Sequence, residues 1–243
     1  MIPFPAVAVV GYKKSGKTLL LEGILETLHR DSPHLRPHVI KHSQEPLPSG
    51  MEDTMRLFPH ASTVEGLFRE GSALLTHKLL PLPTYPEEVE GDLLLLEGFK
   101  EVFRLPRILC LRSPQEWEEL STGLELACFS LSPMEIPGVT LFGPQEIPEL
   151  TARLLTSGFL LPGFDCGGCG KKSCRALARE IVAGKASPKE CVNDSSQEIS
   201  VQVGNQRLSL NGFTGNALRN VISAYLKTLK GTGDGPVTIR FRL

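Results

Sequence analysis

The segment that most restricts the fold is an eight-residue loop near the start of the chain, residues 11–18, with the sequence GYKKSGKT. It matches the pattern G-x-x-x-x-G-K-T without exception, which is the Walker A pattern of phosphate-binding loops. The apolar run at residues 6–10 precedes the loop and predicts a buried parallel strand. Leucine and isoleucine residues at helical spacing follow it and predict a helix over residues 18–28. Strand, loop and helix therefore occur in the order that such a loop requires.

The chemistry of this loop follows from its residue types. Gly11 and Gly16 allow the backbone to curl until its N–H groups face a phosphate, and the following helix adds the positive end of its dipole. Lys17 supplies a positive charge for the β- and γ-phosphates, and the Thr18 hydroxyl can ligate Mg²⁺. The alternative to a phosphate-binding loop is that a Gly-Lys-Thr sequence precedes a helix by chance. Two further candidates for phosphate contacts within the loop are Lys14 and Ser15.

A second signal of a nucleotide site is the sequence DLLLLEGFK at residues 92–100. Its four leucines predict a fully buried strand, and Glu97 stands at the carboxyl end of that strand. Ligands of open α/β sheets bind at this edge, and Gly98 lets the chain turn there. Glu97 therefore has the position of the Walker B aspartate and is expected to contact Mg²⁺ through water or to orient the attacking water. Lys17 and Glu97 are the candidate catalytic residues.

Polar residues near this edge extend the candidate site. Lys41 and His42 end a strand predicted over residues 36–42 and could contact a phosphate or a partner protein. For His42, an ordinary surface histidine is the competing interpretation. Asp53 and Arg56 are weaker candidates, because a local ion pair that caps a helix explains them equally well.

Repeated strand and helix patterns predict an α/β protein. We expect residues 1–160 to form a three-layer sandwich with a mainly parallel sheet, the architecture of P-loop NTPases. Residues 161–195 are expected to form a small helical module, and residues 196–243 a small ββαβ unit. The other elements expected are strands at residues 72–77, 107–111, 124–129 and 139–142, a helix at 144–155, a hairpin at 199–210, a helix at 216–229 and a strand at 237–241.

Four of the six cysteines lie within 26 residues, with the spacing C-x2-C-x4-C-x16-C; they are Cys166, Cys169, Cys174 and Cys191. Glycines around the first two let the backbone fold tightly and offer N–H groups to sulfur. Four thiolates fit a 4Fe–4S cluster or a zinc ion. The cluster is favoured because structural zinc sites usually pair two C-x2-C knuckles, and this segment has one. Cys110 and Cys128 lie in apolar runs and are expected to be buried.

Composition limits the classes of function. With 41% hydrophobic and 22% charged residues, the 243-residue chain is expected to fold. Residues 165–243 carry 12 basic and 6 acidic side chains, whereas residues 1–164 carry 14 and 21. A basic module suits an anionic cluster or an acidic partner, and its scattered charges without an aromatic stripe argue against nucleic acid.

We find no signal peptide and no apolar run of the ~20 residues that span a membrane, so we expect a cytoplasmic protein.

Three stretches together resemble one family. Residues 11–18, the sequence VIKH at residues 39–42 and the sequence LEGFK at residues 96–100 are similar to the molybdopterin-guanine dinucleotide biosynthesis adapter proteins, the MobB family, over about residues 5–157. Asp53-Thr54 followed by Arg56 is similar to the D-T-x-R segment of that family. Two departures are a segment at residues 60–62 without its usual glycine and fewer histidines after His42. The cysteine segment resembles the 4Fe–4S domain of electron-transfer and corrinoid iron–sulfur proteins.

The resemblance implies a protein that binds GTP and Mg²⁺, hydrolyses GTP slowly and assists the enzyme that attaches GMP to molybdopterin. Its implied partner is the molybdenum cofactor guanylyltransferase or a molybdenum or tungsten enzyme such as a formate dehydrogenase. The chain has no N-K-x-D guanine signature, so GTP over ATP is implied by the resemblance alone. Two alternatives are a nucleotide-gated electron-transfer or cluster-carrier protein and a zinc-stabilised binding module with weak NTPase activity. The sequence does not decide the oligomeric state, and in particular it does not say whether the chain forms a homodimer.

Overall fold

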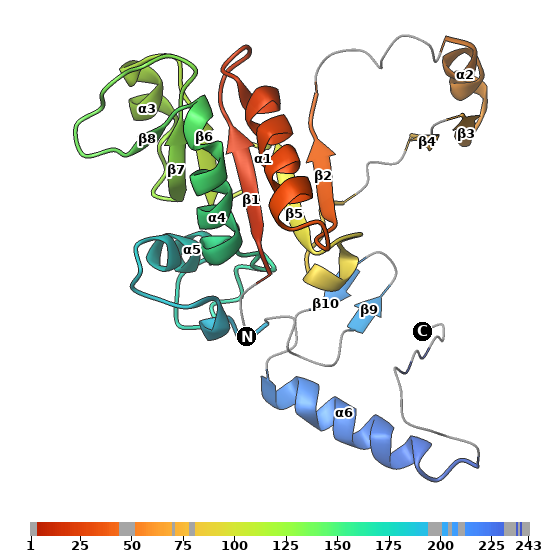
Figure 1. The fold of residues 1–243 in the computed structure, drawn as a ribbon. Helices are drawn as coiled ribbons and strands as arrows, with labels where there is room; N and C mark the ends of the chain where they lie inside the picture. Colours follow the sequence, from red (N-terminus) through yellow and green to blue (C-terminus); the bar gives the residue numbers. More distant parts are fainter. Residues whose placement is uncertain are drawn as a thin grey trace.

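The computed structural model describes residues 4–43, 52–69, 71–77, 81–193, 201–203, 206–208, 212–230, 237 and 239. At its centre is a six-stranded sheet in which every strand pairing is parallel (Figure 1). In spatial order its strands are β2 (Pro37–Lys41), β5 (Leu93–Glu97), β1 (Ala6–Val10), β6 (Arg107–Cys110), β7 (Glu125–Phe129) and β8 (Leu141–Phe142). The predicted α/β class with a mainly parallel sheet is confirmed.

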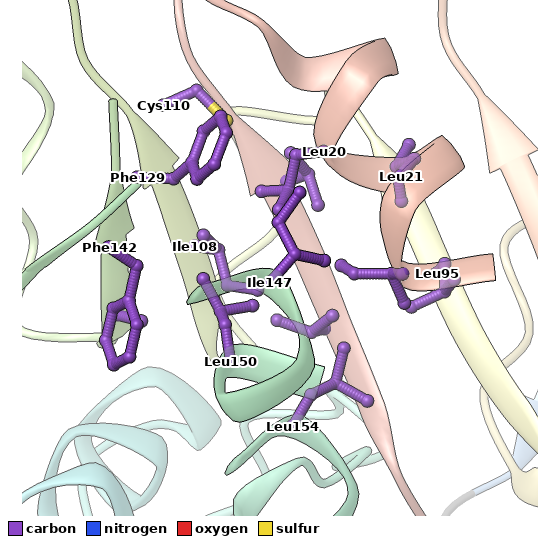
Figure 2. Packing of buried hydrophobic residues seen from close by; sticks show 14 of the residues in the cluster. Leu20, Leu21, Leu95, Ile108, Cys110, Phe129, Phe142, Ile147, Leu150 and Leu154 are labelled. Carbon is purple, nitrogen blue, oxygen red and sulfur yellow. The ribbon is translucent and has the colours of Figure 1, made fainter. Parts of the chain in front are cut away.

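Helices and loops cover both faces of the sheet, which explains the continuous apolar sequences of β1 and β5. On one face α1 (Lys17–Asp31) packs beside α4 (Ile147–Ser157), which follows the short 3₁₀ helix η3 (Pro144–Glu146) (Figure 2). The other face is covered by residues of α3 (Pro114–Leu120) and of the loops, with η2 (Pro86–Glu88) ahead of β5. The sheet is therefore the middle layer of the predicted three.

The register of the sheet decides which side chains meet at its carboxyl edge. Glu97, the last residue of β5, lies opposite Val9 of β1 on one side and opposite Lys41 of β2 on the other. The loop after β1, the end of β5 and the end of β2 are therefore neighbours.

The cysteine-containing segment packs at the opposite, amino-terminal edge of the sheet (Figure 1). Its helix α5 (Cys174–Val182) begins after Ser173, whose hydroxyl accepts the N–H of Ala176, and η4 (Pro188–Glu190) follows it. Leu177 of α5 lies in a buried cluster with Leu124, which precedes β7. The Arg179 Nε donates to the Thr122 carbonyl at 2.6 Å and ties α5 to the same end of the sheet.

Two parts of the chain lie outside this sheet. Between β2 and β5 are α2 (Glu52–Leu57), η1 (Phe58–His60) and a hairpin of β3 (Thr63–Phe68) and β4 (Gly71–Thr76). The strand expected at 72–77 thus pairs with a strand that the sequence did not predict. In the tail, β9 (Val201–Val203) and β10 (Gln206–Leu208) form the expected hairpin, followed by α6 (Gly212–Leu226). Of the last expected strand, at 237–241, the structure describes only residues 237 and 239, so this expectation is not tested. Within the described residues no helix is long and apolar enough to cross a membrane.

Candidate nucleotide and four-cysteine sites

The loop between β1 and α1 has the tight backbone that its glycines predict. Gly16 has φ of 87° and Lys14 has φ of 62°, so both lie in the left-handed region. A Cβ on Gly11 would lie 2.4 Å from the Ser15 Oγ and 2.5 Å from the Cys110 carbonyl oxygen, so only glycine fits there. Gly16 is the N-cap of α1 and has no side chain to accept the first N–H groups of the helix, which leaves them directed at the loop.

Two side chains of this loop indicate a site for an oxygen-rich ligand. The Ser15 hydroxyl is only 1% exposed, and within the described part of the chain it has no hydrogen-bond partner. A buried hydroxyl in this state is costly, and a phosphate oxygen at the loop would satisfy it. The Lys17 Nζ donates to the Tyr12 carbonyl at 2.7 Å, so the ammonium group lies against the backbone of the loop itself.

Three polar side chains from three elements meet beside the loop. Thr18 of α1 donates through Oγ1 to the Glu97 Oε1 at 3.1 Å. The Lys41 Nζ at the end of β2 lies 3.2 Å from the Glu97 Oε2 and donates to the Thr18 Oγ1 at 3.4 Å. Glu97 is 6% exposed, and a buried carboxylate of this kind needs a cation beside it. That cation is the Lys41 ammonium group.

The other sequence-predicted residues lie differently. The ring centroid of His42 is 5.5 Å from that of Phe99, so His42 packs against the turn after β5, where Gly98 has φ of 95°. Arg56 belongs to α2, which lies apart from the loop between β1 and α1 (Figure 1), so the structure does not bring it to the site. The side chain of Asp53 lies outside the described residues.

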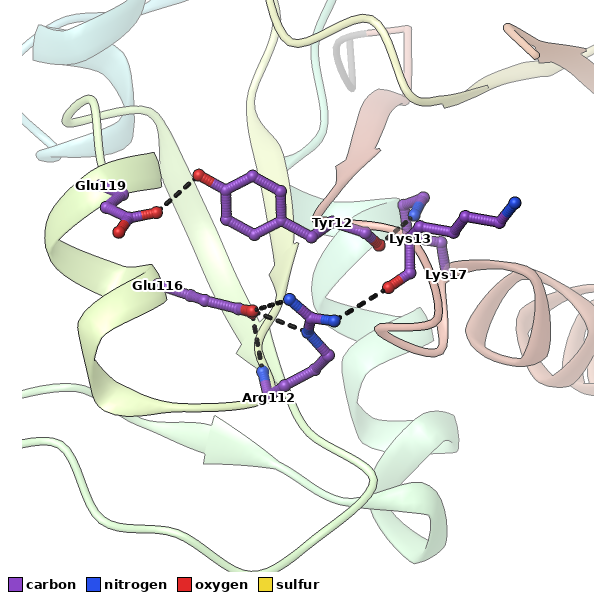
Figure 3. Close-up of polar contacts among 6 residues, drawn as sticks. All are labelled: Tyr12, Lys13, Lys17, Arg112, Glu116 and Glu119. Carbon is purple, nitrogen blue, oxygen red and sulfur yellow. Dashed lines mark hydrogen bonds and ion pairs between the residues drawn. The ribbon is translucent and has the colours of Figure 1, made fainter. Parts of the chain in front are cut away.

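Sequence reasoning missed the contacts of Tyr12, the second residue of the loop. Its hydroxyl donates to the Glu119 Oε2 at 2.5 Å (Figure 3). The Lys100 Nζ lies 3.9 Å from its ring centroid. The hydrogen bond to the Glu119 carboxylate, with a smaller effect of burial, raises the pKa of Tyr12. The loop is therefore fastened to α3 and to the segment after β5.

Arg112, two residues after the end of β6, makes the second missed set of contacts. It donates to the Lys13 carbonyl at 3.2 Å and forms an ion pair with Glu116 at 2.5 Å (Figure 3). Both glutamates that hold these groups lie on α3. The available sequence signal was Ser113-Pro114, because serine at the N-cap followed by proline is a typical helix start.

The four clustered cysteines surround one hollow at the other edge of the sheet. All four line it, together with Lys171, Ser173 and Asn193 among others. Cys166 is exposed, Cys169 and Cys174 are partly buried, and Cys191 is buried. No group of three or more His, Cys, Asp or Glu among the described residues is arranged to hold a single metal ion, and the thiols instead stand around the hollow.

Glycines and backbone donors shape this hollow. Gly167 and Gly170 have φ of 69° and 78°, and a Cβ on Gly168 would lie 2.5 Å from the Val192 Cγ2. The Asp165 N–H donates to the Cys174 Sγ at 3.4 Å. Four thiols and backbone N–H groups around a hollow form a donor set that fits an iron–sulfur cluster.

Burial raises the pKa of four of the cysteine thiols. It raises the pKa of Cys191 to about 11 and also raises the pKa of Cys174. Cys128 lies in the sheet, where burial raises its pKa to about 12, and burial raises the pKa of Cys110 as well. The thiols of Cys110 and Cys128 are therefore protonated core residues, as the sequence predicted.

Comparisons with known proteins give a match to the cysteine segment and relatives of the whole chain. A family model described as "Putative Fe-S cluster" matches residues 161–192. A Methanocaldococcus jannaschii protein described as "Putative molybdopterin-guanine dinucleotide biosynthesis adapter protein" is 25% identical over 247 residues, which cover 98% of this chain and 96% of that protein. The crystal structure of Bacillus subtilis MobB is 26% identical, covers 62% of this chain and 98% of its own, and superposes with a TM-score of 0.49.

A second relative decides the family. The Bacillus subtilis (strain 168) protein described as "Probable molybdopterin-guanine dinucleotide biosynthesis adapter protein" is 35% identical over 127 residues, which cover 49% of this chain and 71% of that protein. The resemblance seen in the sequence is thereby confirmed, and the chain belongs to the family of molybdopterin-guanine dinucleotide biosynthesis adapter proteins.

Proposed function

We propose that this protein is a GTP-binding adapter in the maturation of molybdenum or tungsten cofactors and that it carries a 4Fe–4S cluster. It would assist guanine dinucleotide attachment or delivery to a redox enzyme. In this proposal residues 1–160 bind nucleotide, residues 161–195 hold the cluster and residues 196–243 form a third unit. The observation that carries it is the meeting of Thr18, Glu97 and Lys41 beside the loop between β1 and α1, in a chain of this family.

The loop residues have distinct proposed roles. Backbone N–H groups between Gly11 and Thr18 hold the phosphates, and the Lys17 ammonium leaves the Tyr12 carbonyl to reach them. Thr18 and Glu97 would hold Mg²⁺, which neutralises charge on the β- and γ-phosphates. Glu97 also orients the attacking water.

The nucleotide assignment is tested by calorimetric titration of GTP and ATP in Mg²⁺-containing buffer, followed by measurement of phosphate release. We expect saturable binding of GTP, tighter than that of ATP, with turnover slower than the usual enzymatic range of about 1 per second or more. Equal affinities for both nucleotides would remove the guanine preference. Absence of binding for both nucleotides would contradict the proposal that this protein binds GTP.

The cluster assignment is tested by metal and sulfide analysis of protein purified without oxygen. The support for iron is the family-model match and the hollow lined by Cys166, Cys169, Cys174 and Cys191. We expect about four iron and about four sulfide per chain and a brown protein. One zinc per chain without iron would instead support the zinc-stabilised binding module.

Lys41 leads to a prediction about Mg²⁺. Its ammonium lies between Glu97 and Thr18, the two groups proposed to hold the metal ion, so it competes with Mg²⁺ for them. Lys41→Met should lower the Mg²⁺ concentration needed for half-maximal GTP binding by about threefold to tenfold. The reason is that an ion pair between an exposed ammonium group and a buried carboxylate contributes about 1 kcal/mol. Lys13→Met, in the loop between β1 and α1, removes an exposed lysine near the site and is the control, which should leave the requirement unchanged. A higher Mg²⁺ requirement in Lys41→Met would show that Lys41 assists metal binding.

One segment favours a second candidate function, nucleotide-gated electron transfer. Residues 98–106 run from the nucleotide edge of the sheet to the cysteine edge. At the start, the Lys100 Nζ lies over the ring of Tyr12. At the far end, the Phe103 ring centroid lies 4.1 Å from the Arg175 guanidinium carbon of α5. Next to it, Arg104 and Leu161 exchange two hydrogen bonds of 3.0 Å. A change of the loop on nucleotide binding therefore has a continuous packed route to the cysteines.

This candidate predicts that nucleotide changes the reduction potential of the cluster. Redox titrations of the loaded protein without nucleotide, with GDP and with GTP should give different midpoint potentials, because the packing around Cys174 shifts with the segment. The Lys17→Ala variant is the control and should show one potential in all three conditions. Identical potentials in the unaltered protein, measured at saturating nucleotide, would rule out gating and leave the adapter function alone.

A further inference from the structure

The side chain of Asn193 is directed at the cysteine site, although the residue lies one position beyond the family-model match. Its Nδ2 donates to the Cys166 Sγ at 3.0 Å across 27 residues of sequence. Asn193 is 4% exposed. A buried amide is costly unless it is hydrogen-bonded, so this position is specified by its partners.

The residues before Asn193 close the hollow on the same side. Val192 packs so tightly on Gly168 that a Cβ there would lie 2.5 Å from its Cγ2. Cys191 is buried, whereas Cys166 is the exposed member of the four. Residues 191–193 therefore lie against the loop that carries Cys166 and fix its position through one sulfur contact and one packing contact.

The exposed thiol is where electron exchange with another molecule is geometrically easiest. A cluster held by the four cysteines would approach the surface at Cys166 and be covered by protein at Cys191. An N–H group that donates to a ligating sulfur stabilises negative charge on it, and this stabilisation is larger in the reduced cluster, which carries one more electron. The Asn193 amide is placed at the corner where that charge matters most.

We propose that Asn193 is a positioning residue that holds Cys166 and raises the reduction potential of the cluster, with the Cys166 corner as the point of electron exchange. The step is the uptake of one electron from a low-potential one-electron donor, in which iron is reduced and no bond forms or breaks. This inference rests on the proposed cluster and adds that the cluster is redox-active.

The test is a redox titration of three Asn193 variants, each with iron and sulfide analysis. Asn193→Leu keeps the approximate shape and removes the donor, and Asn193→Asp also adds a negative charge. Both potentials should be more negative than that of the unaltered protein, with Asp the lower. Asn193→Gln retains an amide donor and should recover part of the shift. Equal potentials in the unaltered and Leu proteins at equal iron content would overturn the inference.

A measurement on the unaltered protein covers the case in which the variants fail to take up iron. Resonance Raman spectra of the unaltered protein in H₂O and D₂O should show a shift of the Fe–Sγ stretching bands, because the hydrogen of the Asn193 amide exchanges with solvent. Unshifted bands would overturn the role of Asn193. Unaltered protein that contains no iron would contradict the proposed cluster, so the two failures are distinguishable.

Discussion

Replacing Lys17 with alanine is expected to lower GTP affinity by at least about 30-fold. The removal of one partner from a hydrogen-bonded charge pair at a binding site costs about 2–5 kcal/mol, and each 1.4 kcal/mol is tenfold. Among the described residues the Lys17 ammonium donates its hydrogen bond to the Tyr12 carbonyl, so the substitution breaks no ion pair within them. We therefore expect affinity to fall without a comparable fall in stability. Calorimetric titration and a thermal melt measure the two effects.

The control for this variant is Lys13→Ala. Lys13 is an exposed lysine of the same loop, and the backbone carbonyl that accepts the Arg112 hydrogen bond remains when its side chain is truncated. Its GTP affinity should stay within about threefold of that of the unaltered protein. Retention of GTP binding by Lys17→Ala would contradict the assignment of the loop between β1 and α1 as the phosphate site.

The second large effect is expected for Cys191→Ser. Serine keeps the size of the side chain but replaces the thiolate that a cluster requires. Cys191 is the buried member of the four cysteines, and it lines the hollow from the segment that follows η4. We expect anaerobically purified Cys191→Ser to lose most of its iron and sulfide and its brown colour, as measured by colorimetric metal analysis and visible absorption.

Cys128→Ala provides the matched control, because it removes a buried cysteine from the sheet. Its thiol is held protonated by burial, with a pKa of about 12, and it lies outside the hollow. This variant should retain the full iron content. Iron content in Cys191→Ser equal to that in Cys128→Ala would show that Cys191 does not ligate the cluster.

The parts of the fold that the sequence predicted well are those whose signals are local. The buried strand β1, its glycine-containing loop and α1 follow one another within 31 residues, and the burial of β5 follows from four consecutive leucines. The segment 72–77 was correctly expected as a strand. Its partner β3 has only exposed and half-buried residues and therefore a weak hydrophobic pattern, so the sequence did not predict β3 or the hairpin. The short α3 was missed because seven residues hold too few turns to show helical periodicity.

The contacts that complete the two sites are long-range, and no motif encodes them. Lys41 meets Glu97 because β2 pairs with β5 in one register, and the sequence does not state which strands are neighbours. Tyr12 meets Glu119 across 107 residues, and Asn193 meets Cys166 across 27. Side chains that act through such pairings were therefore visible only once the topology was known.

The adapter function is tested most directly by titrating purified molybdenum cofactor guanylyltransferase against the cluster-loaded protein without oxygen. Binding should be tightest with GTP and Mg²⁺, weaker with GDP, and insensitive to nucleotide in Lys17→Ala. The γ-phosphate distinguishes GTP from GDP, and in this account the loop that contains Lys17 is what contacts it. Equal affinity with GTP, with GDP and without nucleotide would contradict a nucleotide-dependent adapter. Absence of binding in every state would contradict the proposed partner.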